Sequence, residues 1–176
     1  SWTDRQTGRR ITAVARWIER RRGGRTESPR PAPLVVFVHG YALDPGDYRR
    51  LLVRWARAGY VVLAPRMPGT GRAAPGGPNR ADLANQPRDV RFLVSKALAE
   101  SRRSGSFLEG LVASGRIAVA GHSDGAATAL AVAYDPAFRD VRVDAVVSLA
   151  GAAIPGTGPL RFGAGAPPLL AVQGGA

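Results

Sequence analysis

The stretch "RIAVAGHSDGAATALA", residues 116–131, decides the fold that we expect for this chain. An apolar run ends at Gly121, a run of small residues begins after Gly125, and Ser123 stands between the two glycines. A serine raised above a sheet on a sharp strand-to-helix turn needs glycine on both sides, because side chains there would collide with neighbouring backbone. The pattern therefore predicts that Ser123 is a nucleophile at such a turn. The alternative is an ordinary glycine-rich connection between a strand and a helix.

A serine hydroxyl needs a base to become nucleophilic, and the chain holds only two histidines, His39 and His122. His122 precedes Ser123 on the predicted strand, where adjacent side chains point to opposite faces. We expect His122 to be a packed, hydrogen-bonded residue. We do not expect His39 to act either, because a base must lie within hydrogen-bond reach of the nucleophile.

The segment "HGYALDPGDY", residues 39–48, follows another apolar strand and is the expected source of an oxyanion-binding group. Stabilising an oxyanion requires two backbone N–H groups aimed at the developing charge. We predict that Asp124, after the serine, supplies one of them and that Tyr41 supplies the other, while Gly40 allows a close backbone approach. The Tyr41 ring either flanks the substrate or packs on its own loop.

Strands and helices alternate along the chain. Strands are predicted at 9–18, 33–40, 60–66, 116–123, 143–151 and 167–174. Helices are predicted at 48–59, with Asp47 as its N-cap, at 86–103 and at 126–135. Loops are predicted at 19–33 and 67–80. This order predicts an α/β fold, in which a mostly parallel central sheet has helices on both faces. Ligands bind such sheets at the carboxyl ends of the strands, where His39 and Ser123 are expected.

Composition is that of one soluble globular domain over residues 1–176, with 45% hydrophobic and 22% charged residues. No apolar run is long enough to span a membrane, and no signal peptide is visible at Ser1. The absence of cysteine excludes a cysteine nucleophile and thiolate metal sites. The net charge of +12 comes from scattered arginines with few aromatic residues among them, which favours a solvated surface over a specific nucleic-acid site. Weak attraction to anionic surfaces or polymers stays open.

Residues 33–71, 85–98, 116–131 and 143–152 together resemble the α/β-hydrolase superfamily, and more narrowly its chlorophyllase-like and platelet-activating-factor-acetylhydrolase-like esterases, which are related to the cutinase-type polyester hydrolases. The resemblance implies a Ser–acid–His triad in that chain order, with Ser123 as nucleophile and Tyr41 and Asp124 at the oxyanion positions. It implies no metal and no organic cofactor. Many such bacterial esterases are exported, so the resemblance is compatible with secretion.

The chain departs from this family pattern near its end. In the resembling proteins the acid follows the strand that "PPLLAVQGGA" (167–176) resembles, and the histidine follows one further strand. We therefore expect a truncated α/β-hydrolase domain that lacks the C-terminal strand and helix, with the acid and the histidine beyond Ala176. Such a chain alone would be nearly inactive, because a hydrolase without a complete triad keeps only residual catalysis.

The leading functional hypothesis is a serine hydrolase that acts on small or polymeric carboxylic esters. Hydrolysis of amides or peptides is a second hypothesis, since peptidases of this fold share the serine turn. A hydrolase fold that serves as a non-catalytic binding module is the third, and the missing base is its main support. The sequence assigns neither the acyl and alcohol groups of the substrate nor the oligomeric state.

Overall fold

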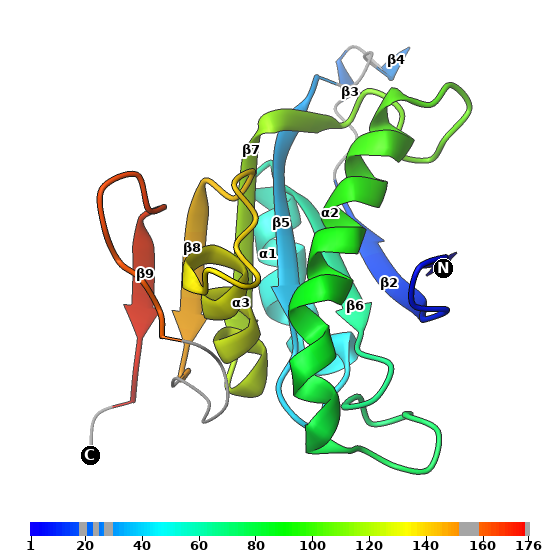
Figure 1. Ribbon diagram of the computed structural model, residues 1–176. Helices are drawn as coiled ribbons and strands as arrows, with labels where there is room; N and C mark the ends of the chain where they lie inside the picture. The colour runs from blue at the N-terminus through cyan, green and yellow to red at the C-terminus, as the bar shows by residue number, and fades with distance from the viewer. Residues whose placement is uncertain (18–20, 23–24, 27–29, 152–158, 175–176) are drawn as a thin grey trace.

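The computed structural model describes residues 1–17, 21–22, 25–26, 30–151 and 159–174 (Figure 1). Its strands are β1 (Trp2–Thr3), β2 (Arg10–Arg16), β3 (Arg21–Arg22), β4 (Arg25–Thr26), β5 (Ala32–Val38), β6 (Val61–Arg66), β7 (Val112–His122), β8 (Ala145–Leu149) and β9 (Leu169–Val172). Its helices are α1 (Arg49–Arg57), α2 (Gln86–Arg102) and α3 (Asp124–Tyr134), with 3-10 turns η1 (Pro45–Tyr48) and η2 (Arg80–Asn85). The predicted α/β fold is confirmed.

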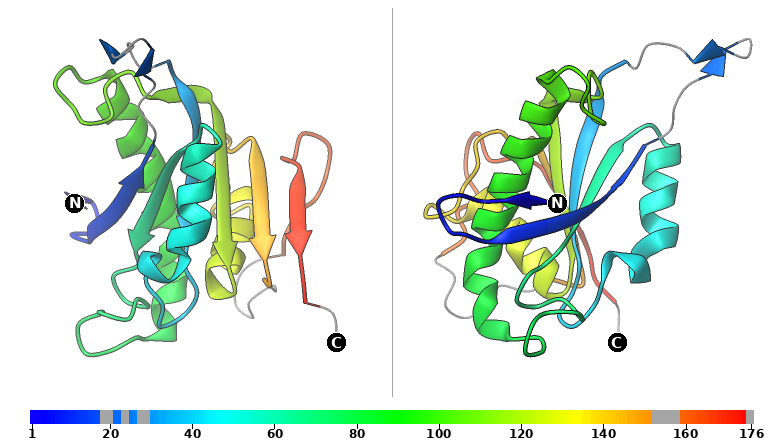
Figure 2. Two further views of the ribbon diagram at one scale, coloured as in Figure 1. Left: turned by 180° about the vertical axis from the view of Figure 1, so that it is seen from behind. Right: turned by 90° about the vertical axis from the view of Figure 1, so that its right-hand side faces the viewer.

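Seven of these strands form one sheet in the order β1-β2-β6-β5-β7-β8-β9. Every pairing from β6 to β9 is parallel, whereas β2 runs antiparallel to β6, and β1 runs antiparallel to β2. Helix α1 covers one face of the sheet, and α2 and α3 cover the other (Figure 2). The sheet is therefore mostly parallel and covered on both faces, as the alternating pattern predicts.

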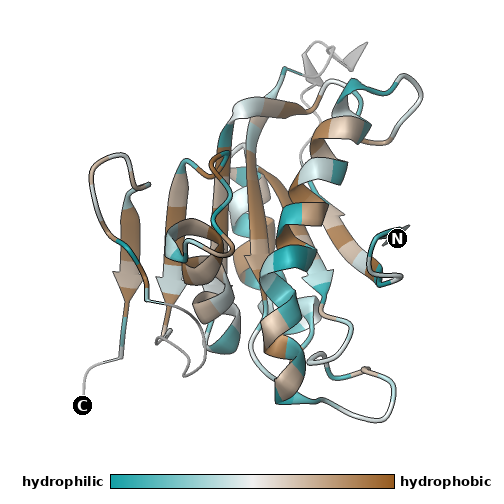
Figure 3. Cartoon of the chain, in the orientation of Figure 1, coloured by the Kyte–Doolittle hydropathy of each residue, from teal (hydrophilic) through white to brown (hydrophobic). Residues whose placement is uncertain are grey.

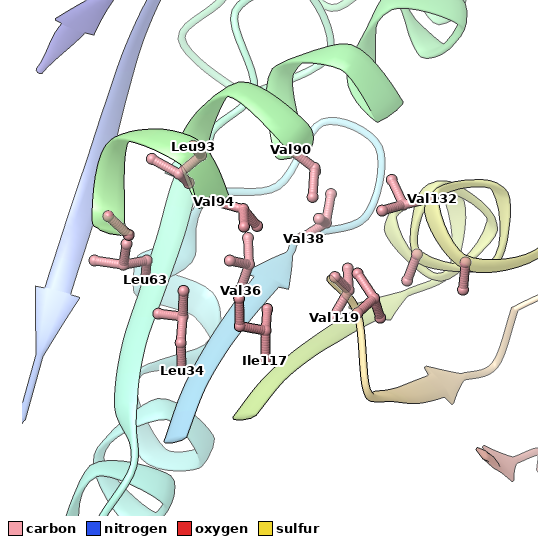
Figure 4. Close-up of a cluster of buried hydrophobic side chains, with 14 of the residues drawn as sticks. Leu34, Val36, Val38, Leu63, Val90, Leu93, Val94, Ile117, Val119 and Val132 are labelled. Carbon is pink, nitrogen blue, oxygen red and sulfur yellow. The ribbon is translucent and has the colours of Figure 1, made fainter. Parts of the chain in front are cut away.

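The central strand β5 explains why both faces are covered, because its side chains alternate between two apolar clusters. Leu34, Val36 and Val38 pack under α2 and α3, where Figure 4 shows them, whereas Val35 and Phe37 pack under α1. Burying each such side chain stabilises the fold by about 1.5–3 kcal/mol. Figure 3 shows the same division, with apolar strands inside and polar residues on the outer turns of the helices.

The start of the first helix differs from the prediction. Asp47 is not the N-cap; Asp44 caps η1 instead, accepting a hydrogen bond from the Gly46 N–H, while the Asp47 carboxylate accepts one from the Asp44 N–H. Pro45 explains this earlier start, since proline is suited to the first turn of a helix. Gly59, at φ +97°, ends the helix as predicted.

Other boundaries shift by a few residues. β7 begins at Val112 rather than at residue 116, and α3 begins at Asp124 rather than at residue 126. The predicted loop at 19–33 lies partly outside the described residues, and its described pairs 21–22 and 25–26 form a small antiparallel ladder. No helix in the described part of the chain is both long and apolar enough to cross a membrane.

Candidate active site

Ser123 lies between the end of β7 and the first turn of α3, at the carboxyl edge of the sheet. Its backbone has φ +53° and ψ −121°, a left-handed conformation that costs a non-glycine residue about 1–3 kcal/mol. The Ser123 N–H donates to the Leu149 carbonyl at 2.9 Å, and the Ser123 carbonyl accepts from the Ala126 N–H at 2.9 Å. The strain is therefore held by neighbouring backbone on both sides.

Gly121 and Gly125 make this turn possible by leaving room for backbone. A Cβ atom on Gly121 would overlap the backbone of Gly125, and a Cβ atom on Gly125 would overlap the carbonyl groups of Val38 and His39. The start of α3 thus rests directly on the end of β5. Larger residues at either glycine would push the serine turn away from the sheet.

Tyr41 and Asp124 place two free backbone donors near the serine. In the described part of the chain neither N–H has a hydrogen-bond acceptor. Val38 and Gly121 are paired in register on adjacent strands, so the turns that follow them share one edge of the sheet. A Cβ atom on Gly40 would lie only 3.1 Å from His122 Nδ1, which shows how close the two turns are.

His39 is unsuited to act as a base because both of its ring nitrogens are engaged. Its Nε2 atom accepts a hydrogen bond from the Met67 N–H at 3.0 Å, so we assign the proton to Nδ1, which donates to the Gly40 carbonyl at 2.8 Å. The ring is 1% exposed, and burial lowers its pKa. His39 is therefore a neutral residue whose side chain connects its own segment, 39–48, to the backbone that follows β6.

His122 is hydrogen-bonded elsewhere, as the strand geometry predicts. Its Nδ1 atom is hydrogen-bonded to Tyr48 Oη at 2.8 Å, and the same oxygen accepts the Gly40 N–H at 3.1 Å. Among the described residues, no histidine and no carboxylate is hydrogen-bonded to the Ser123 hydroxyl. Nor does the described part of the chain gather three or more His, Asp or Glu side chains that could hold a metal ion.

The Tyr41 side chain packs on the loop that precedes η2. Its Oη donates to the Pro78 carbonyl at 2.7 Å, and the Arg80 guanidinium lies 4.7 Å from the ring centroid. Arg80 Nε also lies 3.5 Å from Asp124 Oδ2, a buried oxygen without a hydrogen-bond donor in the described part of the chain. Arg80 therefore bridges the side chains of the two residues whose N–H groups are free.

A buried chain of hydrogen bonds links the backbone segments that carry these two N–H groups. The Ala42 N–H donates to the Thr70 carbonyl at 2.9 Å, and the Thr70 hydroxyl accepts from Gln86 Nε2 at 2.6 Å. Gln86 Oε1 accepts from the Thr128 hydroxyl at 2.5 Å, and that hydroxyl lies 3.2 Å from the Asp124 carbonyl. We call Thr70, Gln86 and Thr128 the buried relay; these three side chains are at most 3% exposed.

Strained residues gather at the same edge of the sheet. Besides Ser123, two non-glycine residues in the described part of the chain have positive φ, namely Ala42 at +55° and Ala150 at +48°. They follow β5 and β8, the strands on either side of β7. Backbone strain that is concentrated in one place is typical of functional sites.

Sequence reasoning missed Arg80, Tyr48 and the buried relay. The sequence contained one usable signal for the relay, because Thr128 is the only serine or threonine within α3, where most residues are small and apolar. Residues 67–80 are predicted only as a loop, and nothing in their composition marks Thr70.

A family model described as Chlorophyllase matches residues 28–173. A ferulic acid esterase from Streptomyces cinnamoneus is 32% identical, with 73% of this chain and 39% of that chain covered and a TM-score of 0.54. No curated protein matches the sequence.

Two more distant structures share the fold. An acetyl xylan esterase from Paenibacillus sp. R4 is 22% identical, with 82% of this chain and 46% of that chain covered and a TM-score of 0.55. Esterase 2 from Thermogutta terrifontis is 16% identical, with 80% of this chain and 50% of that chain covered and a TM-score of 0.55. This chain thus spans half or less of the length of each of these three proteins.

Proposed function

This chain belongs to the chlorophyllase family, and we propose that the protein is a serine hydrolase of carboxylic esters. Two comparisons support this proposal. The family model matches residues 28–173, and the chain is 32% identical to a structure named as a ferulic acid esterase. The observation that carries the proposal is at the sheet edge. There Ser123 has a strained backbone conformation, and the N–H groups of Asp124, in the same turn, and of Tyr41, in the neighbouring turn, have no acceptor among the described residues.

In the proposed reaction Ser123 Oγ attacks the ester carbonyl carbon, and its proton passes to a histidine base. The N–H groups of Tyr41 and Asp124 stabilise the negative charge that develops on the carbonyl oxygen. Collapse of this intermediate releases the alcohol, which takes up the proton, and leaves an acyl group on Ser123. A water molecule then attacks the acyl group and releases the carboxylic acid.

The proposal assigns the histidine and the acid of the triad to a part of the parent protein outside residues 1–176. Support comes from the engagement of both histidines of this chain in other hydrogen bonds, His39 with Met67 and Gly40, and His122 with Tyr48. The Tyr41 ring, anchored at Pro78 and half-buried, is proposed to border the substrate on its open side.

The test is labelling of the full-length protein with a fluorophosphonate probe, followed by assays on p-nitrophenyl butyrate and on a peptide p-nitroanilide. We expect one labelled site, lost in Ser123→Ala and kept in Ser114→Ala, which changes an exposed serine of β7. Ester turnover should greatly exceed anilide turnover. Labelling that survives Ser123→Ala contradicts the proposed nucleophile, whereas a full-length protein that neither reacts nor turns over ester is a non-catalytic module.

A further inference from the structure

We propose that a groove on the outer face of α2, formed without any residue of the candidate active site, binds an acidic polysaccharide. The groove has a volume of about 810 Å³. Its walls are the turn between β1 and β2 (Thr3–Thr7), the exposed face of α2, and Arg142. Figure 2 shows the N-terminal hairpin passing beside α2.

The side of α2 that faces the groove carries three cations at different heights along the helix, which we call the row. Arg88, Arg91 and Lys96 line the groove together with Phe92 and Ser95, a spacing that places all five residues on one side of the helix. With a rise of about 1.5 Å per residue, Arg88 and Lys96 are separated by about 12 Å along the axis. This length exceeds one phosphate or sulfate ion and fits a chain that carries several anionic groups.

None of these cations is held in a close ion pair in the described part of the chain, although Lys96 interacts at longer range with Glu100, and Arg91 with Asp140. Among the described residues, no carboxylate lies within ion-pair distance of Arg5, Arg88, Arg91 or Lys96. Arg142 differs, because Asp140 holds its guanidinium at 2.6 Å. The groove therefore presents a positive field that an anionic ligand can neutralise.

Asp4 is the single acidic residue of the lining, and its carboxylate is already used within the N-terminal turn. It accepts hydrogen bonds from the Gln6 N–H at 3.0 Å and from the Thr7 hydroxyl at 2.8 Å. Four cations without ion pairs thus face one carboxylate that is engaged locally.

The other lining residues favour a carbohydrate over a nucleic acid. Thr3 and Gln6 add a hydroxyl and an amide, which suit the hydroxyl groups of sugars. Phe92 is the single aromatic residue of the lining, and Lys96 Nζ lies 6.0 Å from its ring centroid. One ring shared with a cation offers an apolar surface for a sugar, whereas single-stranded nucleic acids are bound by several rings on which successive bases stack.

The test compares two triple variants of the chain that lose the same charge. Arg88→Gln/Arg91→Gln/Lys96→Gln removes the row in the groove, and Arg50→Gln/Arg54→Gln/Arg57→Gln removes three exposed arginines of α1. Binding of a heparin-derived octasaccharide is measured by titration calorimetry at about 150 mM salt, where distant charges are screened. We expect the groove variant to bind about tenfold or more weakly and the α1 variant to change by less than about twofold.

Arg5→Gln tests the opposite wall on its own and is expected to weaken binding about threefold. This single change keeps the proposal testable if the triple groove variant does not fold. A heparin-derived disaccharide should bind much more weakly than the octasaccharide, because it cannot span the row.

Three results would overturn the proposal. One is an equal loss in the two triple variants, which would assign binding to net charge alone. Another is equal affinity for the disaccharide and the octasaccharide. The third is a single-stranded oligonucleotide of matched charge that binds the groove more tightly than the octasaccharide.

Discussion

Thr128 and Thr70 are hydrogen-bonded to the two ends of one amide group, that of Gln86. Gln86 Oε1 accepts from the Thr128 hydroxyl at 2.5 Å, and Gln86 Nε2 donates to the Thr70 hydroxyl at 2.6 Å. Thr128 belongs to the helix that begins at Asp124, and Thr70 holds the backbone next to Tyr41. The buried relay thus connects the two halves of the proposed oxyanion-binding group. Because stabilising an oxyanion requires closely fixed donors, the relay has consequences for rate.

Thr128→Val in the full-length protein is expected to lower kcat for ester hydrolysis about tenfold with little change in KM, because a displaced donor is felt mainly in the transition state. Thr128→Ser keeps the hydroxyl and should retain most of kcat, which separates positioning from simple loss of packing. A tetrahedral boronic-acid inhibitor should lose affinity in parallel with kcat/KM. If both variants lose kcat equally, the hydroxyl has no positioning role.

Ser123→Gly is expected to stabilise the fold while it abolishes the proposed activity. Glycine adopts φ +53° without steric strain, so the free energy of unfolding should rise by about 1 kcal/mol despite glycine's greater freedom in the unfolded chain. Urea unfolding of the chain measures the change. Ser123→Ala serves as control, because alanine keeps the strain and should leave stability nearly unchanged.

Gly125→Ala is expected to destabilise the fold by about 3 kcal/mol or more, because its Cβ atom would overlap the carbonyl groups of Val38 and His39. Gly115→Ala is the matched control, since a Cβ atom there meets nothing within 4 Å and φ is not in the left-handed region. Thermal unfolding followed by circular dichroism compares the two. Similar melting temperatures for both variants would show that α3 can move away from β5 at little cost.

Asp140 should make stability depend on pH. Burial alone would raise its pKa, but the hydrogen bonds from Arg142 outweigh burial and lower that pKa below its ordinary value. A lowered pKa contributes stability at pH above the ordinary value, and this contribution is lost as pH falls through the lowered pKa.

Asp140→Asn is therefore expected to cost about 1–2 kcal/mol at pH 7, and the difference from the parent chain should shrink towards pH 2–3. Chemical unfolding across that pH range provides the measurement. Glu109→Gln, which changes an exposed carboxylate, is the control. A penalty for Asp140→Asn that is independent of pH would exclude the ion pair with Arg142 as its cause.

The strands and helices of the sheet could be predicted from the sequence because each element is encoded by its own neighbouring residues. Runs such as 33–40 and 60–66 are apolar and rich in valine, and the helix at 86–103 repeats its apolar residues at helical spacing, so each element is visible in its own residues. The Ser123 turn was visible for the same reason, since its two glycines lie within two residues of the serine.

What the sequence did not predict depends on partners that are distant along the chain. Gln86 meets Thr70 and Thr128 across 16 and 42 positions, and Arg80 reaches Tyr41 and Asp124 across a similar range. No periodicity encodes such contacts. The misplaced helix cap had a local cause, because Asp44 and Asp47 are equally suitable capping residues and Pro45 decided between them.

Because Ala42, Ser123 and Ala150 have left-handed backbone conformations, the two edges of the sheet should differ in which substitutions they tolerate. These residues lie after three adjacent strands, so one edge of the sheet contains all three of the described non-glycine residues that have positive φ. In a saturation library screened for folded protein, glycine should be enriched at these three positions. In a screen for activity, glycine should be depleted at Ser123. Diversity for directed evolution is therefore better placed at the opposite edge, where the parallel strands begin.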